Sequence, residues 1–305
     1  MPTFSSHGKL LLTGEYLVLR RAIALALPTR LGQTLQVQAL ETDNDTLAWN
    51  ANQPSGPWFS ATLQRHDFSV IQTNDAEKVQ RLVDVLEAVR QLNPSLFSQN
   101  DLQFTTQLDF NPQWGLGSSS TLIANLAQWA SINPYTLLKM TFGGSGYDVA
   151  CASAKGPILY QRCDDIPVAT PVEFNPPFSN QLFFVYQGHK QNSANEVSSF
   201  QQKIQGVDLK DDVETISDIS KALPTLTSLN DFCYFLRIHE EMMSYLLDRD
   251  PIGSQFPDFA GTLKSLGAWG GDFFLAATPW PYEQTKSYFL DKGYDTLLPY
   301  SELIL

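Results

Sequence analysis

Two glycines and four hydroxyl side chains lie together in Trp114-Gly115-Leu116-Gly117-Ser118-Ser119-Ser120-Thr121. A strand is expected before this segment and a helix after it. Glycines let a ligand approach the backbone closely, and the first N–H groups of a helix lack partners and favour an anion. The hydroxyls add hydrogen-bonding groups and oxygen ligands for a divalent cation. The segment therefore has the parts of a phosphate-binding loop.

An ordinary glycine turn with a serine helix cap explains the same residues, and the local sequence does not decide between the two interpretations. Two better-known phosphate loops are excluded. A P-loop needs a lysine directly before its Ser or Thr, and a dinucleotide-binding loop needs a third glycine where Ser120 stands.

A single carboxylate stands among small residues in Gly143-Gly144-Ser145-Gly146-Tyr147-Asp148-Val149-Ala150. The chain has 32 Asp and Glu residues, yet none lies between Asp109 and Asp148. Asp148 is therefore a candidate general base, with a glycine-rich turn and an aspartate helix cap as the alternative. A serine nucleophile elbow is not supported, because Tyr147 stands at the position of its final glycine.

A third glycine-rich segment, Lys264-Ser265-Leu266-Gly267-Ala268-Trp269-Gly270-Gly271-Asp272, precedes an expected apolar strand. Its glycines can line a binding cleft. A tight turn before a strand is the better explanation when the segment is considered alone.

The elements that position these segments follow from hydrophobic periodicity. Apolar residues at three- and four-residue intervals predict a helix over 77–92, which ends before Pro94. Apolar, β-prone runs predict linked strands at 10–12, 16–19 and 22–27, whereas the Asn-, Asp- and Pro-rich stretch 43–57 is expected to be a loop. Further expected elements are strands at 58–63, 102–110, 158–161, 182–186 and 273–277 and helices at 211–223 and 229–248.

The length of 305 residues fits two modest domains. The Pro- and Asn-rich stretch 166–180 is the candidate boundary, because its prolines interrupt both helix and strand. We expect an N-terminal lobe over 1–170 and a C-terminal lobe over 171–305.

Charge and composition exclude several classes of protein. With 20 Lys and Arg against 32 Asp and Glu, the net charge of −12 disfavours nucleic acid and anionic membranes as partners. No apolar run reaches the roughly 18 residues of a membrane span, and the N-terminus lacks the order of a signal peptide, so a cytoplasmic protein is expected. Three cysteines without CxxC spacing indicate neither a disulfide framework nor a structural zinc site.

His239-Glu240-Glu241 is expected to be a solvated helix face, since no second histidine stands at ligand spacing.

Four segments together resemble the ordered motifs of the GHMP kinases, the superfamily of galactokinase, homoserine kinase, mevalonate kinase and phosphomevalonate kinase. They are residues 8–16, 115–119, 146–150 and 267–272, so the resemblance spans most of the chain. The Gly-Ser-Gly-Tyr-Asp-Val-Ala segment and the Gly-Gly-Asp ending are similar to phosphomevalonate kinases. A branch with a Gly-Tyr-Asp-Val/Ile-Ala signature is more similar still.

The resemblance implies an α+β, two-lobed GHMP kinase fold, with an N-terminal lobe like ribosomal protein S5 domain 2, which would bind ATP, and a ferredoxin-like C-terminal lobe. It implies ATP and Mg²⁺ as cofactors and a small, mevalonate-like acceptor as substrate, and a homodimer is left open. Lys9 would neutralise transferring charge or hold an anionic acceptor, and Asp148 would accept the acceptor's hydroxyl proton. The ATP phosphates would be held by Gly115, Leu116, Gly117, Ser118, Ser119 and Ser120, with Ser119 or Ser118 as the Mg²⁺ ligand. The candidate acceptor-site residues are Glu15, Lys190, Ser193, Gly270 and Gly271, and for Lys190 and Ser193 an exposed loop is the alternative.

The chain departs from these relatives at several places. Residues 137–147 contain no acid where many relatives carry an acidic Mg²⁺ ligand, Gln113 and Trp114 stand where phosphomevalonate kinases often have a lysine, and Trp269 stands where a small glycine is usual. An ATP-dependent small-molecule kinase is the first hypothesis. The alternatives are a catalytically silent GHMP-fold protein that binds a metabolite or partner, and an ATP-dependent decarboxylase like diphosphomevalonate decarboxylase.

Overall fold

The computed structural model describes residues 1–305 apart from residues 43, 99, 165 and 192, and the side chain of Ser193 also lies outside the described part. The chain forms two compact units. The first comprises residues 1–8, 31–112 and 116–153, and the second comprises residues 9–30, 113–115 and 154–305. The sequence predicts one boundary after residue 170, whereas these units interleave, because strands β1 (Thr3–Leu11) and β2 (Ala24–Ala39) each pass from one unit into the other.

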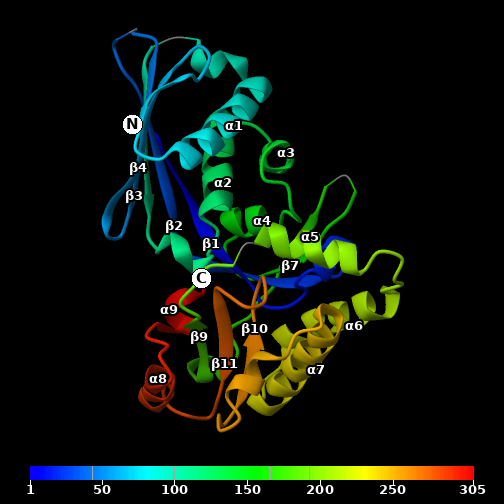
Figure 1. Cartoon of the computed structure of the whole chain (residues 1–305). Coiled ribbons are helices and arrows are strands. Elements are labelled where there is room, and N and C mark those ends of the chain that lie inside the picture. The colour runs from blue at the N-terminus through cyan, green and yellow to red at the C-terminus, as the bar shows by residue number, and fades with distance from the viewer. Residues whose placement is uncertain (43, 99, 165, 192) are drawn as a thin grey trace. The chain divides into compact units, whose positions relative to one another are not determined.

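The first unit is a sheet with helices packed on one face (Figure 1). Strand β3 pairs antiparallel with β4 and parallel with β6, β4 pairs antiparallel with β5, and β6 pairs antiparallel with residues 33–39 of β2. The other elements of this unit are β3 (Thr46–Gln53), β4 (Gly56–Gln64), β5 (Val70–Thr73), β6 (Leu102–Leu108), α1 (Ala76–Leu92), α2 (Ser118–Ala130), α3 (Pro134–Met140) and α4 (Tyr147–Ser153).

The helix expected over 77–92 is confirmed as α1. Asp75 caps it by accepting hydrogen bonds from the backbone amides of Glu77 and Lys78. Its buried stripe packs with apolar residues of α2, α3 and the strands in one core. That core fixes the helices on the sheet, and with them the N-termini of α2 and α4.

The expected loop over 43–57 is wrong for most of its length, because β3 and the start of β4 form a hairpin there; residue 43 lies outside the described residues. Leu47, Trp49 and Ala51 are buried and alternate with more exposed residues along β3. A strand with one solvent-facing side needs apolar residues only at every second position. The polar residues at the other positions of β3 make its sequence resemble a loop.

The second unit contains a four-stranded antiparallel sheet in the order β10-β11-β9-β12. Residues 24–26 of β2 pair with β7, and β7 pairs with β8. Helix α7 packs against β10, and α8 contributes Phe289 to the core of the sheet. The elements are β7 (Ile158–Gln161), β8 (Val168–Pro171), β9 (Leu182–Tyr186), β10 (Thr262–Ser265), β11 (Phe273–Ala277), β12 (Leu297–Pro299), α5 (Ser193–Lys203), α6 (Lys210–Ala222), α7 (Leu229–Leu247), α8 (Tyr282–Asp291) and α9 (Tyr300–Leu303).

One expected strand of the second unit, at 16–19, is wrong. Leu17–Arg20 is a 3₁₀ helix, preceded by Gly14 at φ 88° and Tyr16 at φ 59°. Two left-handed residues so close together cannot continue an extended strand. In the described part of the chain, no helix is both long and apolar enough to cross a membrane.

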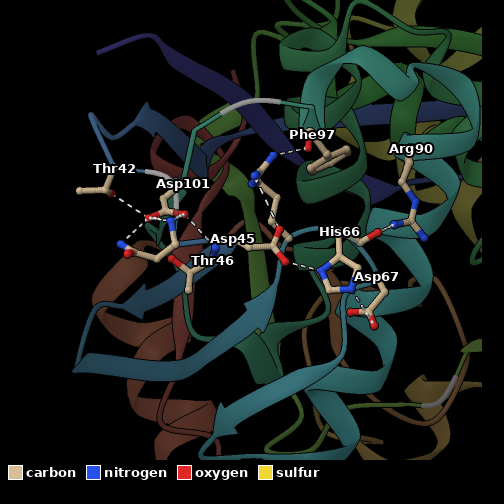
Figure 2. Close-up of polar contacts among 10 residues, drawn as sticks. Thr42, Asp45, Thr46, His66, Asp67, Arg90, Phe97 and Asp101 are labelled. Atoms are coloured by element: carbon tan, nitrogen blue, oxygen red, sulfur yellow. Dashed lines mark hydrogen bonds and ion pairs between the residues drawn. The ribbon is translucent and has the colours of Figure 1, made fainter.

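The start of the β3–β4 hairpin is fixed by a buried carboxylate that follows α1 (Figure 2). Asp101 is 1% exposed and accepts hydrogen bonds from the Thr46 amide at 2.8 Å, the Thr42 hydroxyl at 2.7 Å and the backbone and side-chain amides of Asn44. The Thr46 amide, with Thr42 and Asn44, holds the pKa of Asp101 far below its usual range. Asp101 is therefore an ionised anchor for residues 42–46.

We expect Asp101→Asn to lower the thermal midpoint at neutral pH. The new side-chain NH₂ is a donor, and it would face the N–H and O–H groups that now donate to the carboxylate. The lowered pKa means that the charge stabilises the fold above the unfolded-state pKa near 4, and that this stabilisation is lost as pH falls through the folded-state value. Melting curves between pH 3 and pH 7 should show the gap between wild type and variant closing toward acid. The exposed Asp109→Asn is the control, and an equal loss in both variants would contradict the anchor role.

Candidate functional site

The glycine-rich loop 115–117 leads directly into α2. Gly115 and Gly117 have φ angles of 67° and 93°, in the left-handed region that favours glycine, and Leu116 between them is fully buried. Gly117 is the residue before the helix, and no side chain caps it. The buried leucine anchors the loop, and the two glycines turn the backbone into the helix.

The hydroxyls after the loop divide into two groups. Ser120 is buried and donates to the Gly117 carbonyl at 2.9 Å, and Thr121 donates to Gln33 at 3.0 Å. Ser119 is exposed and Ser118 half-buried, and within the described part of the chain neither hydroxyl has a hydrogen-bond partner. The structure thus leaves Ser118 and Ser119 for a ligand, whereas Ser120 can contribute only its backbone amide.

A buried polar network fixes the start of α2 on the sheet of the first unit. Ser6 donates to the side-chain oxygen of Asn125 at 2.6 Å, and the Asn125 amide donates to the Gln33 carbonyl at 2.9 Å. Asn125 and Gln33 are almost fully buried, so each must keep these partners. Sequence reasoning missed these residues, because a lone Asn inside a helix carries no signal of its partners.

Asp148 lies in the first turn of α4, half-buried, and α4 packs against α2 in the same unit. One carboxylate oxygen accepts a hydrogen bond from the Val149 amide at 3.0 Å. Both the candidate base and the candidate phosphate loop therefore lie at the beginnings of helices that pack on each other.

Lys9 contacts Gly115, and both residues belong to the second unit. Its Nζ, on β1, donates to the Gly115 carbonyl at 2.7 Å. The carboxylate of Asp272 also packs on this glycine, because a Cβ added to Gly115 would lie 2.2–2.4 Å from the three carboxyl atoms. The structure thus brings three motif residues together, of which sequence reasoning did not name Asp272 as a site residue.

The segment 267–272 is held by side chains from the loop after β9. Gln191 donates to the Trp269 carbonyl at 3.0 Å, Gln187 donates to the Gly271 carbonyl at 2.7 Å, and a ring nitrogen of His189 donates to the Gly270 carbonyl. The predicted acceptor residues Gly270 and Gly271 lie in this segment. Lys190 is exposed in the neighbouring loop, and Ser193 begins α5 with its side chain outside the described part.

Glu15 lies in the interior of the second unit, not in an open site. It is 1% exposed, 2.5 Å from Lys264 Nζ and 3.1 Å from His239 Nε2. Burial alone raises the pKa of Glu15, but the charge of Lys264 outweighs it and holds the pKa below its ordinary value. Glu15 is therefore an ionised partner of Lys264.

His239 and Glu240 correct another expectation, because both are buried on α7, and only Glu241 is exposed. The Gly14 amide donates to His239 Nε2 at 3.0 Å, which requires a neutral imidazole. Glu240 accepts hydrogen bonds from the amide and hydroxyl of Ser265. The sequence of this helix gives no sign of these buried partners, because Gly14 and Ser265 are far from it along the chain.

The comparisons with known proteins agree with this architecture. No protein-family model and no curated sequence matches the chain. Among solved structures, Streptococcus pneumoniae phosphomevalonate kinase in complex with phosphomevalonate and AMPPNP matches with a TM-score of 0.71 at 15% identity, over 97% of this chain and 99% of that one. Methanococcus jannaschii mevalonate kinase matches with a TM-score of 0.66 at 17% identity, and the match covers 95% of this chain and 94% of that one. Lactococcus lactis galactokinase complexed with galactose matches with a TM-score of 0.68 at 11% identity, and the match covers 97% of this chain and 92% of that one.

The chain has the fold of the GHMP kinases. The α+β fold implied by the four motifs is thereby confirmed. The GHMP kinase fold supplies no residue roles by itself, so the roles of individual side chains rest on their geometry.

We expect Lys264→Met to destabilise the protein by about 3–5 kcal/mol, because it leaves the Glu15 carboxylate buried without its cation. Urea unfolding measures this loss. The exposed Lys221→Met is the control, and Glu15→Gln combined with Lys264→Met should recover part of the stability. Equal midpoints for Lys264→Met and Lys221→Met would contradict the pairing.

We expect His239 to make the protein less stable as pH falls below about 6.5. Burial, followed by the charge of Lys264, lowers the pKa of His239, so below that pH the unfolded chain binds a proton that the folded chain does not. The expected loss approaches about 1.4 kcal/mol per pH unit. Thermal midpoints between pH 7.5 and pH 5.5 should fall less steeply in His239→Gln than in wild type, and an equal slope in both would contradict this expectation.

Proposed function

We propose that this protein is an ATP-dependent small-molecule kinase of the GHMP type, which transfers the γ-phosphoryl group to a hydroxyl or phosphate of a mevalonate-like acceptor. The observation that carries the proposal is the Lys9–Gly115 hydrogen bond of 2.7 Å. It joins the lysine of the first motif to the first glycine of the phosphate loop, although the two are 106 residues apart. The GHMP kinase fold supports it further.

The start of α2 fits a phosphate group. The amides of Ser118, Ser119 and Ser120 lie in the first turn, where helix amides have no partner within the helix, and no described side chain caps them. These amides would bind phosphate oxygens of ATP, and the exposed Ser119 hydroxyl would be the protein ligand of Mg²⁺. Among the described residues no group of three or more His, Cys, Asp or Glu side chains is placed to hold a metal ion. Mg²⁺ commonly binds through few protein oxygens together with substrate phosphates and water, and when bound it would neutralise charge on the phosphates.

Phosphoryl transfer depends on alignment and charge neutralisation more than on covalent chemistry by the protein. Lys9 would neutralise charge on the transferring group, and Asp148 would accept the proton of the acceptor hydroxyl. Gly270, Gly271 and Lys190 would contribute to the acceptor site. Glu15 would act indirectly, because its buried pair with Lys264 fixes the turn that follows β1.

We expect purified protein to transfer phosphate from ATP, with Mg²⁺, to one member of a panel of mevalonate, phosphomevalonate, homoserine and simple sugars. Asp148→Asn should lower kcat by about 10²- to 10⁴-fold, because the acceptor loses its general base. The exposed Asp109→Asn is the control and should retain wild-type kcat.

The absence of an acid between Asp109 and Asp148 favours a second candidate, a silent GHMP-fold protein that binds a metabolite or partner. No turnover, together with no ATP binding by calorimetry, would overturn the kinase proposal in favour of this candidate. ATP consumption with release of CO₂ from diphosphomevalonate would instead indicate a decarboxylase.

A further inference from the structure

Asp272 occupies a position at which its backbone favours glycine. Its φ angle is 55°, and it follows Gly270 and Gly271 in a glycine-rich segment. Aspartate tolerates the left-handed region better than most residues, but glycine adopts it at no steric cost. The carboxylate is also only 7% exposed, and burying a charge is unfavourable. Neither feature stabilises the fold by itself, and such outliers cluster at functional sites.

The backbone at Asp272 is fixed without its side chain. Its amide donates to the His189 carbonyl at 2.9 Å, and its carbonyl accepts from the Gln187 amide at 2.8 Å. The side chain adds one hydrogen bond, from the Gln191 amide to Oδ1 at 3.2 Å. A glycine at this position would therefore keep the two backbone bonds and lose the carboxylate.

The carboxylate is placed against the group that holds Lys9. It packs directly on Gly115, whose carbonyl accepts the hydrogen bond from Lys9 Nζ. Burial raises the pKa of Asp272, and Lys9 opposes this most strongly, followed by the Gln191 amide and the charges of Lys190 and His189. Tyr186 also faces Asp272, and burial, followed by the charge of Asp272, raises the pKa of Tyr186. Lys9 is thus the main counter-charge of Asp272.

We propose that Asp272 is a positioning residue for Lys9: its carboxylate, packed on Gly115, supplies the counter-charge that directs the Lys9 ammonium at the Gly115 carbonyl. The inference rests on the proposed function only in its last step, in which Lys9 neutralises charge on a transferring phosphoryl group. The strained backbone and the buried charge are then costs that the site requires.

The direct test is the protonation of Lys9, measured by NMR on lysine-labelled protein with the Lys9 signal assigned through Lys9→Arg. In Asp272→Asn, which keeps the side-chain shape, the midpoint of the Lys9 titration should fall by about one pH unit or more. The exposed Asp291→Asn at the end of α8 removes the same charge and should leave the midpoint unchanged. An unchanged Lys9 midpoint in Asp272→Asn would overturn the proposal.

The second measurement is the thermal midpoint of Asp272→Gly. A positioning role predicts a midpoint equal to or above that of wild type, because glycine relieves the left-handed backbone and removes a buried charge. A merely structural carboxylate predicts a lower midpoint, which would overturn the proposal. If the kinase assay shows transfer, Asp272→Gly should lower kcat at least tenfold. If it shows none, a shifted Lys9 midpoint still supports the Asp272–Lys9 pairing while the proposed function fails.

Discussion

The ion pair between Glu15 and Lys264 is the constraint on which the candidate site of the second unit depends. Both side chains are buried, so neither can lose its partner without leaving an unpaired charge in the interior. Glu15 follows β1, which carries Lys9, and Lys264 lies on β10, which leads into the segment that ends at Asp272. The pair therefore fixes the two chain segments whose side chains meet at Gly115. His239 and Glu240 extend this anchoring to α7 by holding Gly14 and Ser265.

The site is built from backbone geometry as much as from side chains. Gly115 has no room for a side chain beside Asp272, and Gly117 turns the backbone into α2. The hydroxyls that follow are divided between holding this turn and facing outward. A loop of this kind can present amides and one or two hydroxyls to a phosphate without any large rearrangement.

The sequence indicates the candidate segments through residue types, and each type has more than one physical explanation. Gly115 and Gly117 have the positive φ angles that favour glycine, and Asp148 lies in the first turn of α4. Periodicity likewise predicted α1 and α7, whose buried stripes are long. Strand β3 was missed because half of its residues face solvent, and its polar side resembles a loop.

The buried contacts that the sequence did not predict join residues that are far apart along the chain. Glu15 and Lys264 are 249 residues apart, so nothing near either residue indicates the pair. In the sequence, His239 and Glu240 resemble a solvated helix face because they stand in a run of ionisable residues. Only the fold shows that α7 buries them. Asp272 was part of a recognised motif, yet its contact with Gly115 depends on how two distant turns are brought together by β1 and β11. Sequence patterns thus name candidate segments, and the fold shows which of their atoms lie close together.

The proposed function requires residues 117–120 to bind phosphate at the start of α2. A backbone-amide NMR titration with ATP and Mg²⁺ tests this binding. Saturable shifts should be largest at the amides of Ser118, Ser119 and Ser120, and small at the equally helical start of α1. No saturable change at these amides, or larger changes elsewhere in the protein, would contradict it.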